Sequence, residues 1–407
     1  MIQTVNETTI ISNIFWKFSK GFLQFILMIL IFRNINISDY GWYITTISIF
    51  ELAAILSLPG VMKIALRSAL LNDARFSNLL GLKFLLLPTL LLGFFYAPYW
   101  TAVPILIAII ADQIAMFAKV KLNEQKKYLS FNIFEILKPF FLILGLSAYI
   151  IIYKDKISLN FLVWLYCFSS VLATFLNILY SKKSASLSLK ISMPTKIDLS
   201  QSFYASGNGL IGIFIKRGSI LFTAIALSST EVVYVNIMIQ IWSIFAVIFT
   251  GVSLSLTRDI YDVSSNYKTL KNTYLRPLAA LILIISISSI VLNIWGSFFL
   301  NLIFGEESLG AKDIIYFSPL ILLFQLPQLI LMSALMRQKK EKLILLLNCI
   351  SILIFSLILF LFTFNLLNLV KILLCFVLFA SFIYSLAFFK PNILEHVINR
   401  KLKQTKK

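Results

Sequence analysis

The sequence predicts an all-α, polytopic integral membrane protein with about twelve transmembrane helices, and three observations support this prediction. Hydrophobic residues make up 59% of the 407 residues and charged residues only 13%, and the mean hydropathy is +0.92. This composition is far more apolar than that of a soluble globular protein. The apolar residues form stretches about as long as a bilayer is thick, and the connections between them are alternately basic and nearly uncharged.

Each apolar stretch is long enough to cross a membrane as a helix. A helix rises about 1.5 Å per residue, so a hydrocarbon core of about 30 Å requires about 20 residues. In chain order, the predicted helices cover residues 9–32, 41–64, 77–96, 99–119, 131–153, 158–180, 203–228, 231–256, 276–304, 312–336, 343–364 and 366–389. Proline inside several of them predicts kinks, which membrane helices tolerate.

The basic residues predict the orientation. When every second connection is assigned to one side, that side and the C-terminal tail hold 25 of the 36 Lys and Arg residues, and the other side holds five. The positive-inside rule places the first side in the cytoplasm, so an even number of helices puts both termini there. The net charge of +19 is spread over these short connections and does not indicate a nucleic-acid-binding surface.

The longest break in apolar character follows the sixth predicted helix, and it is rich in Ser and Lys. It predicts four regions: an N-terminal six-helix lobe over 1–181, a basic cytoplasmic linker over 182–200, a C-terminal six-helix lobe over 201–389 and a basic cytoplasmic tail over 390–407. The three cysteines all lie within apolar stretches and lack paired spacing. We therefore expect no disulfide, metal site or cofactor.

We single out nine ionisable residues inside the predicted helices as candidates, six of them basic and three acidic, a balance of +3. A charge near the bilayer centre is costly. Each one therefore requires a partner, a position from which its side chain reaches the membrane interface, or a function. Lys83, Glu135 and Lys138 lie near the cytoplasmic ends, where long side chains can reach the interface, and the last two are spaced for an i, i+3 pair.

The other six intramembrane charges are the candidate site. We expect Lys17 and Lys20 in the first helix, with Lys216 and Arg217 in the seventh, to line a water-filled pathway and bind substrate. Glu51 in the second helix is either a counter-ion to Lys17 or Lys20 or a proton site. Asp112 in the fourth helix is either a polar contact between helices or an ion-coupling group. Glu51 and Asp112 are thus the candidates for ion coupling.

Several short segments resemble the polysaccharide repeat-unit (O-antigen) flippases, the Wzx family of the multidrug, oligosaccharidyl-lipid and polysaccharide exporter superfamily. They occur in the family's order: Ser38-Asp39-Tyr40-Gly41-Trp42-Tyr43, Leu58-Pro59-Gly60-Val61, Ser229-Thr230-Glu231 and Leu302-Ile303-Phe304-Gly305-Glu306-Glu307. The resemblance extends over most of the chain, although no single segment is specific. Lys216-Arg217 departs from the family, in which an acidic-basic pair is common in the seventh helix.

The resemblance implies two six-helix lobes around a central cavity and a multi-pass protein of the bacterial cell inner membrane. It further implies a flippase that moves polyprenyl-diphosphate-linked oligosaccharides from the cytoplasmic to the outer leaflet by alternating access, without being an enzyme. The expected partners are this anionic lipid-linked substrate, membrane lipids and, as candidates, other polysaccharide-assembly membrane proteins, but no nucleic acid. The excess of intramembrane cations suits a diphosphate.

Two alternatives remain. A drug or cation exporter of the same superfamily would need an acidic cavity, which the balance of +3 disfavours. A membrane polysaccharide polymerase typically has a large outer loop with Arg or His residues. Here no predicted outer connection is long, and the only histidine, His396, lies in the C-terminal tail.

Overall fold

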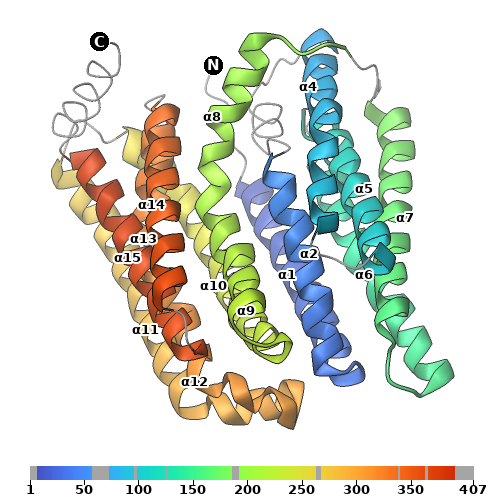
Figure 1. Ribbon diagram of the computed structural model, residues 1–407. Coiled ribbons are helices and arrows are strands. Elements are labelled where there is room, and N and C mark those ends of the chain that lie inside the picture. The colour runs from blue at the N-terminus through green and yellow to red at the C-terminus, as the bar shows by residue number, and fades with distance from the viewer. Residues whose placement is uncertain are drawn as a thin grey trace.

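The computed structural model describes residues 7–56, 73–95, 99–124, 127–185, 192–262, 267–337, 340–362 and 365–389. These residues form a bundle of long helices and contain no β-strand (Figure 1). The predicted all-α fold is therefore confirmed.

In the part of the first half that the structure describes there are seven helical segments. They are α1 (Glu7–Asn34), α2 (Ile37–Leu56), α4 (Asp73–Leu86), the 3₁₀ segment η1 (Leu87–Phe95), α5 (Tyr99–Glu124), α6 (Tyr128–Tyr153) and α7 (Leu159–Ala185). The change from α4 to η1 occurs beside Pro88, whose missing N–H and fixed ring disfavour a regular α-helix.

The second half begins with a composite helix. It consists of α8 (Lys196–Ile213), the π-helical segment η2 (Phe214–Gly218) and α9 (Ser219–Ala226). The remaining segments are α10 (Ser229–Asp262), α11 (Tyr267–Phe304), the 3₁₀ segment η3 (Glu306–Ala311), α12 (Lys312–Ile315), α13 (Phe317–Arg337), α14 (Glu341–Phe362) and α15 (Leu366–Phe389).

Each of the twelve predicted stretches overlaps a described helical segment. Eight of the described helices are long and apolar enough to cross a membrane, or nine if the bent pair Lys196–Ser206 and Ile211–Ala226 is one span. The number is smaller than twelve partly because the predicted second helix continues into residues 57–64, which lie outside the described residues. The third predicted helix is divided at Pro88, so neither part has the required length.

Local hydrogen bonds explain where two helices of the second half begin. Thr195 and Asp198 form a reciprocal pair at the start of α8, in which the Asp198 N–H donates to Thr195 Oγ1 at 3.2 Å and the Thr195 N–H donates to Asp198 Oδ2 at 3.2 Å. Ser228 and Glu231 form the same arrangement before α10, at 3.3 and 3.0 Å. Both are capping boxes, which satisfy N–H groups that the helix itself leaves free. Because α7 extends to Ala185 and α8 begins at Lys196, both ends of the predicted linker 182–200 are helical.

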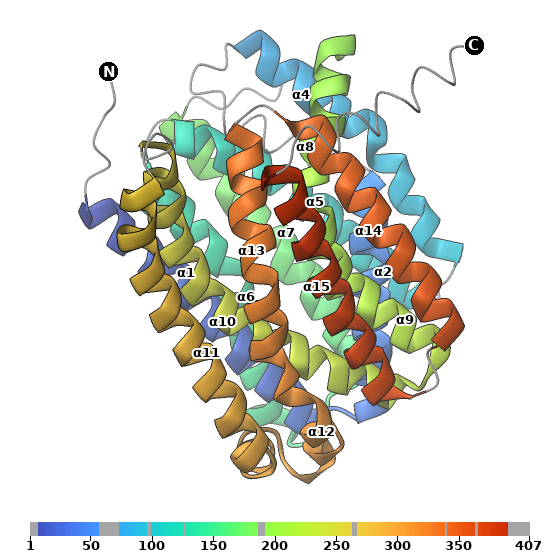
Figure 2. The ribbon, with the colours of Figure 1, turned by 90° about the vertical axis from the view of Figure 1, so that its left-hand side faces the viewer.

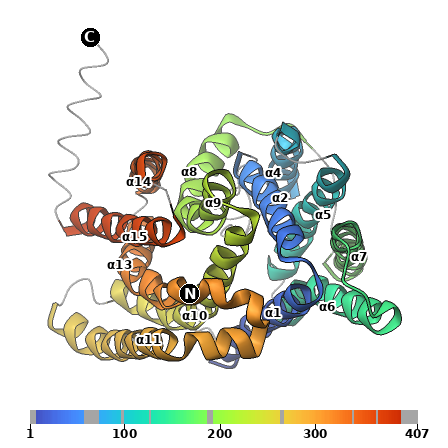
Figure 3. The same ribbon diagram turned by 60° about the horizontal axis from the view of Figure 1, so that its bottom comes forward.

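The helices pack as two groups. In the first group α5 packs against α7 and α1 against α6; in the second, α13 packs against α15 and α14 against α8. The groups meet where α1 and α2 contact α10 and where α2 contacts α9 (Figure 3). The α1–α2, α6–α7 and α9–α10 connections lie together at one end of the bundle, opposite the end where α4 and α8 begin (Figure 1). We call these the α1–α2 end and the α4–α8 end.

Candidate functional site

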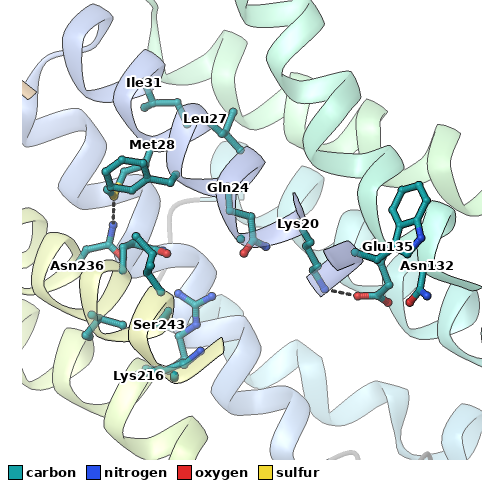
Figure 4. Close-up of a pocket in the computed structure, with 18 of the residues that line it drawn as sticks. Lys20, Gln24, Leu27, Met28, Ile31, Asn132, Glu135, Lys216, Asn236 and Ser243 are labelled. Carbon is teal, nitrogen blue, oxygen red and sulfur yellow. Dashed lines mark hydrogen bonds and ion pairs between the residues drawn. The ribbon is translucent and has the colours of Figure 1, made fainter. Parts of the chain in front are cut away.

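A polar cavity lies between the two helix groups. It consists of two adjoining spaces of about 720 and 600 Å³, which share lining residues including Lys20, Glu135, Arg217 and Asn236. The walls come from α1, α2, α5, α6 and α7 on one side and from η2 and α10 on the other. Figure 4 shows Lys20 and Lys216 reaching this space from opposite groups.

The described cavity residues carry more positive than negative charge. The ionisable lining groups, apart from tyrosines, are Lys20, Lys119, Lys138, Lys216, Arg217, Glu51, Asp112 and Glu135. Five cations and three carboxylates give a net charge of +2. Three of the four predicted substrate-binding residues and both predicted coupling residues therefore line one cavity. The fourth, Lys17, lies in α1 three residues before Lys20, and its side chain is outside the described residues.

Arg217 and Glu51 form an ion pair between the two halves. The Arg217 guanidinium donates from Nε to Glu51 Oε2 at 2.5 Å and from Nη2 to Glu51 Oε1 at 2.8 Å. Two parallel bonds of this kind match the planar fork of arginine to a carboxylate. Of the alternatives for Glu51, the role of counter-ion to Lys20 is wrong, because Lys20 pairs with Glu135. The partner of Glu51 comes from η2, 166 residues further along the chain.

Glu135 holds a second ionic cluster within the first half. Its carboxylate accepts from Lys20 of α1 and, at 2.5 Å, from Lys119 of α5. Lys138 instead donates to Asp112 Oδ2 at 2.5 Å and lies 3.8 Å from the centre of the Tyr166 ring. The predicted Glu135–Lys138 pair is thus wrong, because each side chain reaches another helix.

The prediction that these residues extend to the membrane interface is also wrong. Glu135 and Lys138 line the cavity, where each forms an ion pair with a charged side chain of another helix. Lys83, the third of the group, is only 3% exposed and is enclosed by other helices.

Lys216 has different surroundings from the other cavity cations. Its Nζ lies 4.9 Å from the centre of the Trp242 ring, within the range of a cation–π interaction. Among the described residues, no carboxylate forms an ion pair with it, whereas Lys20, Lys119, Lys138 and Arg217 all have one. Lys216 is therefore the cavity cation best placed to receive an external anion.

The π-helical segment η2 positions Lys216 and Arg217. A π-helix inserts an extra residue into the helical turn, and such segments occur frequently at functional sites. The composite helix also bends by 50° between Lys196–Ser206 and Ile211–Ala226. Both cations therefore project from an irregular part of the helix rather than from a regular face.

Several site residues were not among the predicted ones. Lys119 is the last residue of the predicted helix 99–119 and was not among the candidate residues. Its position seven residues after Asp112 places both on one face of a helix, which is a usable signal. Asn236 and Gln240 of α10 carry no comparable signal, because only the packing of α10 against the first half turns them into the cavity. The described residues contain no cluster of three or more His, Cys, Asp or Glu side chains that could hold a metal ion.

Comparison with protein families and with curated proteins gives no match. Solved structures do match over nearly the whole chain. An inward-facing multidrug resistance MATE family transporter of the MOP superfamily aligns with a TM-score of 0.66, 13% identity and coverage of 90% of this chain and 93% of that chain. An outward-facing one aligns with a TM-score of 0.57, 12% identity and 98% coverage of each chain.

A third matching structure concerns the binding pocket itself. It is a MOP superfamily transporter from Pyrococcus furiosus, for which a binding pocket of reverse polarity is reported to suggest a different function. It aligns with a TM-score of 0.59, 12% identity and coverage of 93% of this chain and 94% of that chain. At this level of identity the matches establish the fold alone: the chain has the overall fold of MATE family transporters of the MOP superfamily.

Proposed function

We propose that the protein is a transporter of the MOP superfamily that carries an anionic substrate through the cavity between its two halves. The observation that carries the proposal is the cavity charge of +2 together with Lys216, which lies against the Trp242 ring and forms no ion pair with any carboxylate that the structure describes. A cavity for cationic drugs would instead present carboxylates that no cation of the protein neutralises. An unpaired cation in the cavity would repel a cationic ligand.

The specific substrate we propose is a polyprenyl-diphosphate-linked oligosaccharide, moved from the cytoplasmic to the outer leaflet of the bacterial inner membrane. A diphosphate is a compact anion with several acceptor oxygens, and Arg and Lys side chains bind such groups with charge-assisted hydrogen bonds. The resemblance to the polysaccharide repeat-unit flippases supports this choice, and the uncharged lining from Gln24, Asn236 and Gln240 suits sugars.

The proposed mechanism is alternating access, with the substrate entering from the α4–α8 end. The halves touch at the α1–α2 end, where Ser38 Oγ lies 3.2 Å from Ser229 Oγ. There Arg33 of α1 also donates to the carbonyl oxygen of Ile303 at 2.9 Å. The higher TM-score with the inward-facing structure than with the outward-facing one, 0.66 against 0.57, supports this reading.

Within this cycle, the anion binds at Lys216 and then competes with Glu51 for Arg217. Because the Arg217–Glu51 pair joins the halves, its displacement loosens them for the rocking motion. A Glu51 or Asp112 carboxylate that has lost its cation is then free to take a proton, which is how either residue would couple transport to an ion gradient.

The test of the proposed function is transport by purified protein in proteoliposomes loaded with a lipid-linked oligosaccharide diphosphate. Lys216→Gln should reduce the rate by about tenfold or more and Lys216→Arg should keep much of it, because a diphosphate requires a cation. Lys183→Gln, which removes an exposed cation at the end of α7, is the matched control. Normal transport by Lys216→Gln would contradict the proposal.

A drug or cation exporter is the second candidate, because the matching structures are named as multidrug resistance transporters. Export of ethidium, a lipophilic cation, from the same liposomes distinguishes the two. We expect no ethidium export by the native protein, and export that depends on Glu51 and Asp112 would favour the cation exporter.

A further inference from the structure

A smaller pocket with a different character adjoins the cationic cavity. It has a volume of about 260 Å³ and is formed by ten side chains of α1, α10, α11 and α12, every one of them Phe, Ile or Leu. Figure 2 shows α1, α10 and α11 side by side on this face of the molecule. The pocket therefore lies along the seam where the two halves meet.

Two side chains separate this apolar pocket from the polar cavity. Phe25 of α1 and Ile244 of α10 line both spaces. They come from different halves of the protein, so a relative movement of α1 and α10 changes the boundary between the two spaces. A ligand with one charged and one apolar part can thus occupy both spaces at once.

The pocket also lies close to the membrane-facing surface. Beside it, α1 and α11 present large exposed apolar side chains, including Phe22, Trp295 and Phe298, which are between 54 and 58% exposed. At the α1–α2 end, Arg33 holds the carbonyl oxygen of Ile303, a residue that lines the pocket. The apolar pocket thus lies between the cationic cavity and the lipid.

We propose that this pocket binds the first segment of the aliphatic chain of an anionic lipid whose diphosphate occupies the cationic cavity. The inference rests on the proposed function and makes it more specific, since a soluble anion would have no use for the pocket. Lipid tails are as apolar as the pocket lining, so moving a chain from the bilayer into it costs little. Placing the same chain in the polar cavity would be costly, because it would separate the charged side chains of the cavity from water and from each other.

Binding to the protein in lipid nanodiscs tests the proposal, with farnesyl diphosphate as the isoprenoid probe and inorganic diphosphate as the chain-free probe. Affinities are corrected for partition of each probe into empty nanodiscs. The native protein should bind farnesyl diphosphate at least about tenfold more tightly than inorganic diphosphate. Leu292→Trp, which fills the pocket from α11, should remove most of this preference and leave the binding of inorganic diphosphate unchanged.

The matched control is Val291→Trp, the neighbouring position on α11, which is 42% exposed and does not line the pocket. It should bind both probes as the native protein does. Ile241→Trp fills the pocket from the wall of α10 and should reproduce the selective loss seen with Leu292→Trp.

Three results would overturn the inference. The first is equal binding of the two probes by the native protein. The second is a preference for farnesyl diphosphate that is retained in Leu292→Trp and Ile241→Trp. That result would mean that the isoprenoid chain does not occupy the pocket, which is then empty or filled by a bulk phospholipid chain. The third is loss of both probes in both variants. Failure of inorganic diphosphate to bind the native protein would instead refute the proposed function.

Discussion

Lys216 and Arg217 are neighbours in the chain, but their contacts assign them different roles. Arg217 is held by two hydrogen bonds to Glu51 of the opposite half, whereas Lys216 rests against the Trp242 ring. The sequence could predict that both face a polar space, because a charge at mid-span is too costly to face lipid. It could not predict the partner of each, because ion pairs such as Arg217–Glu51 form between helices that are distant in the chain.

The first residue-scale prediction concerns the Arg217–Glu51 pair. Glu51→Gln or Arg217→Gln leaves one charge without its partner in a partly buried site, and each should lower stability by about 1–3 kcal/mol. The exchange Glu51→Arg with Arg217→Glu should recover part of that loss. Thermal unfolding in detergent measures the stabilities, and a double-mutant cycle isolates the coupling between the two residues. Strictly additive effects would show that the pair does not hold the halves together.

Glu51→Gln, together with Asp112→Asn, also tests ion coupling, which the geometry leaves as a proposal. If Glu51 or Asp112 carries the coupling proton, Glu51→Gln or Asp112→Asn should make transport insensitive to an imposed pH gradient. Transport in vesicles with and without the gradient is the measurement. An unchanged response in both variants would assign coupling to another group.

At the scale of the elements, two features of the helices follow from local residue patterns that are visible in the sequence. Ser228-x-x-Glu231 is a capping box at the start of α10, and its residues overlap the Ser229-Thr230-Glu231 segment that resembles the flippases. Pro88 accounts for the break between α4 and η1. The π-helical segment η2 has no comparable signal, because a π-helical turn arises from packing and is not encoded by a residue pattern.

The element-scale prediction concerns the beginning of α2. A Cβ added at Gly41 would lie 2.0 Å from the carbonyl oxygen of Ser229, whereas one at Gly212 would meet no atom within 4 Å. Gly41→Ala should therefore push α2 away from α10 and lower stability by about 1–3 kcal/mol, as overpacking does. Gly212→Ala, the matched control, should be neutral or slightly stabilising, since alanine favours the helix. Equal thermal stability of the two variants would contradict this role for Gly41.

On the scale of the whole molecule, three of the four segments that resemble the flippases gather at the α1–α2 end. Gly41 packs on Ser229, Arg33 contacts the carbonyl oxygen of Ile303, and Gly305 adopts a φ of +94° that favours glycine as α11 ends. The fourth segment, Leu58-Pro59-Gly60-Val61, lies outside the described residues. The resemblance is thus concentrated where the halves meet, and residue spacing alone could not indicate this.

The orientation in the membrane remains a prediction of the charge distribution and has a direct test. Alkaline phosphatase fused after Lys183 should be inactive, because that connection carries the basic residues expected in the cytoplasm. A fusion after Glu307, at the α1–α2 end, should be active. The opposite pattern would reverse the proposed direction of transport.

The last prediction tests whether the α1–α2 end opens during transport. Ser38 and Ser229 belong to different halves and their hydroxyl oxygens are 3.2 Å apart, so cysteines at both positions lie within the reach of a disulfide. In a background in which Cys167, Cys349 and Cys375 are replaced by alanine, oxidation of the Ser38→Cys, Ser229→Cys protein should stop transport, and a reductant should restore it. Each single cysteine variant is the control for modification without a cross-link. Because the cationic cavity lies between the same two halves, the oxidised protein should still bind inorganic diphosphate from the α4–α8 end. Transport that continues at the native rate with the disulfide formed would mean that the substrate leaves by another route, and the alternating-access mechanism would then be wrong.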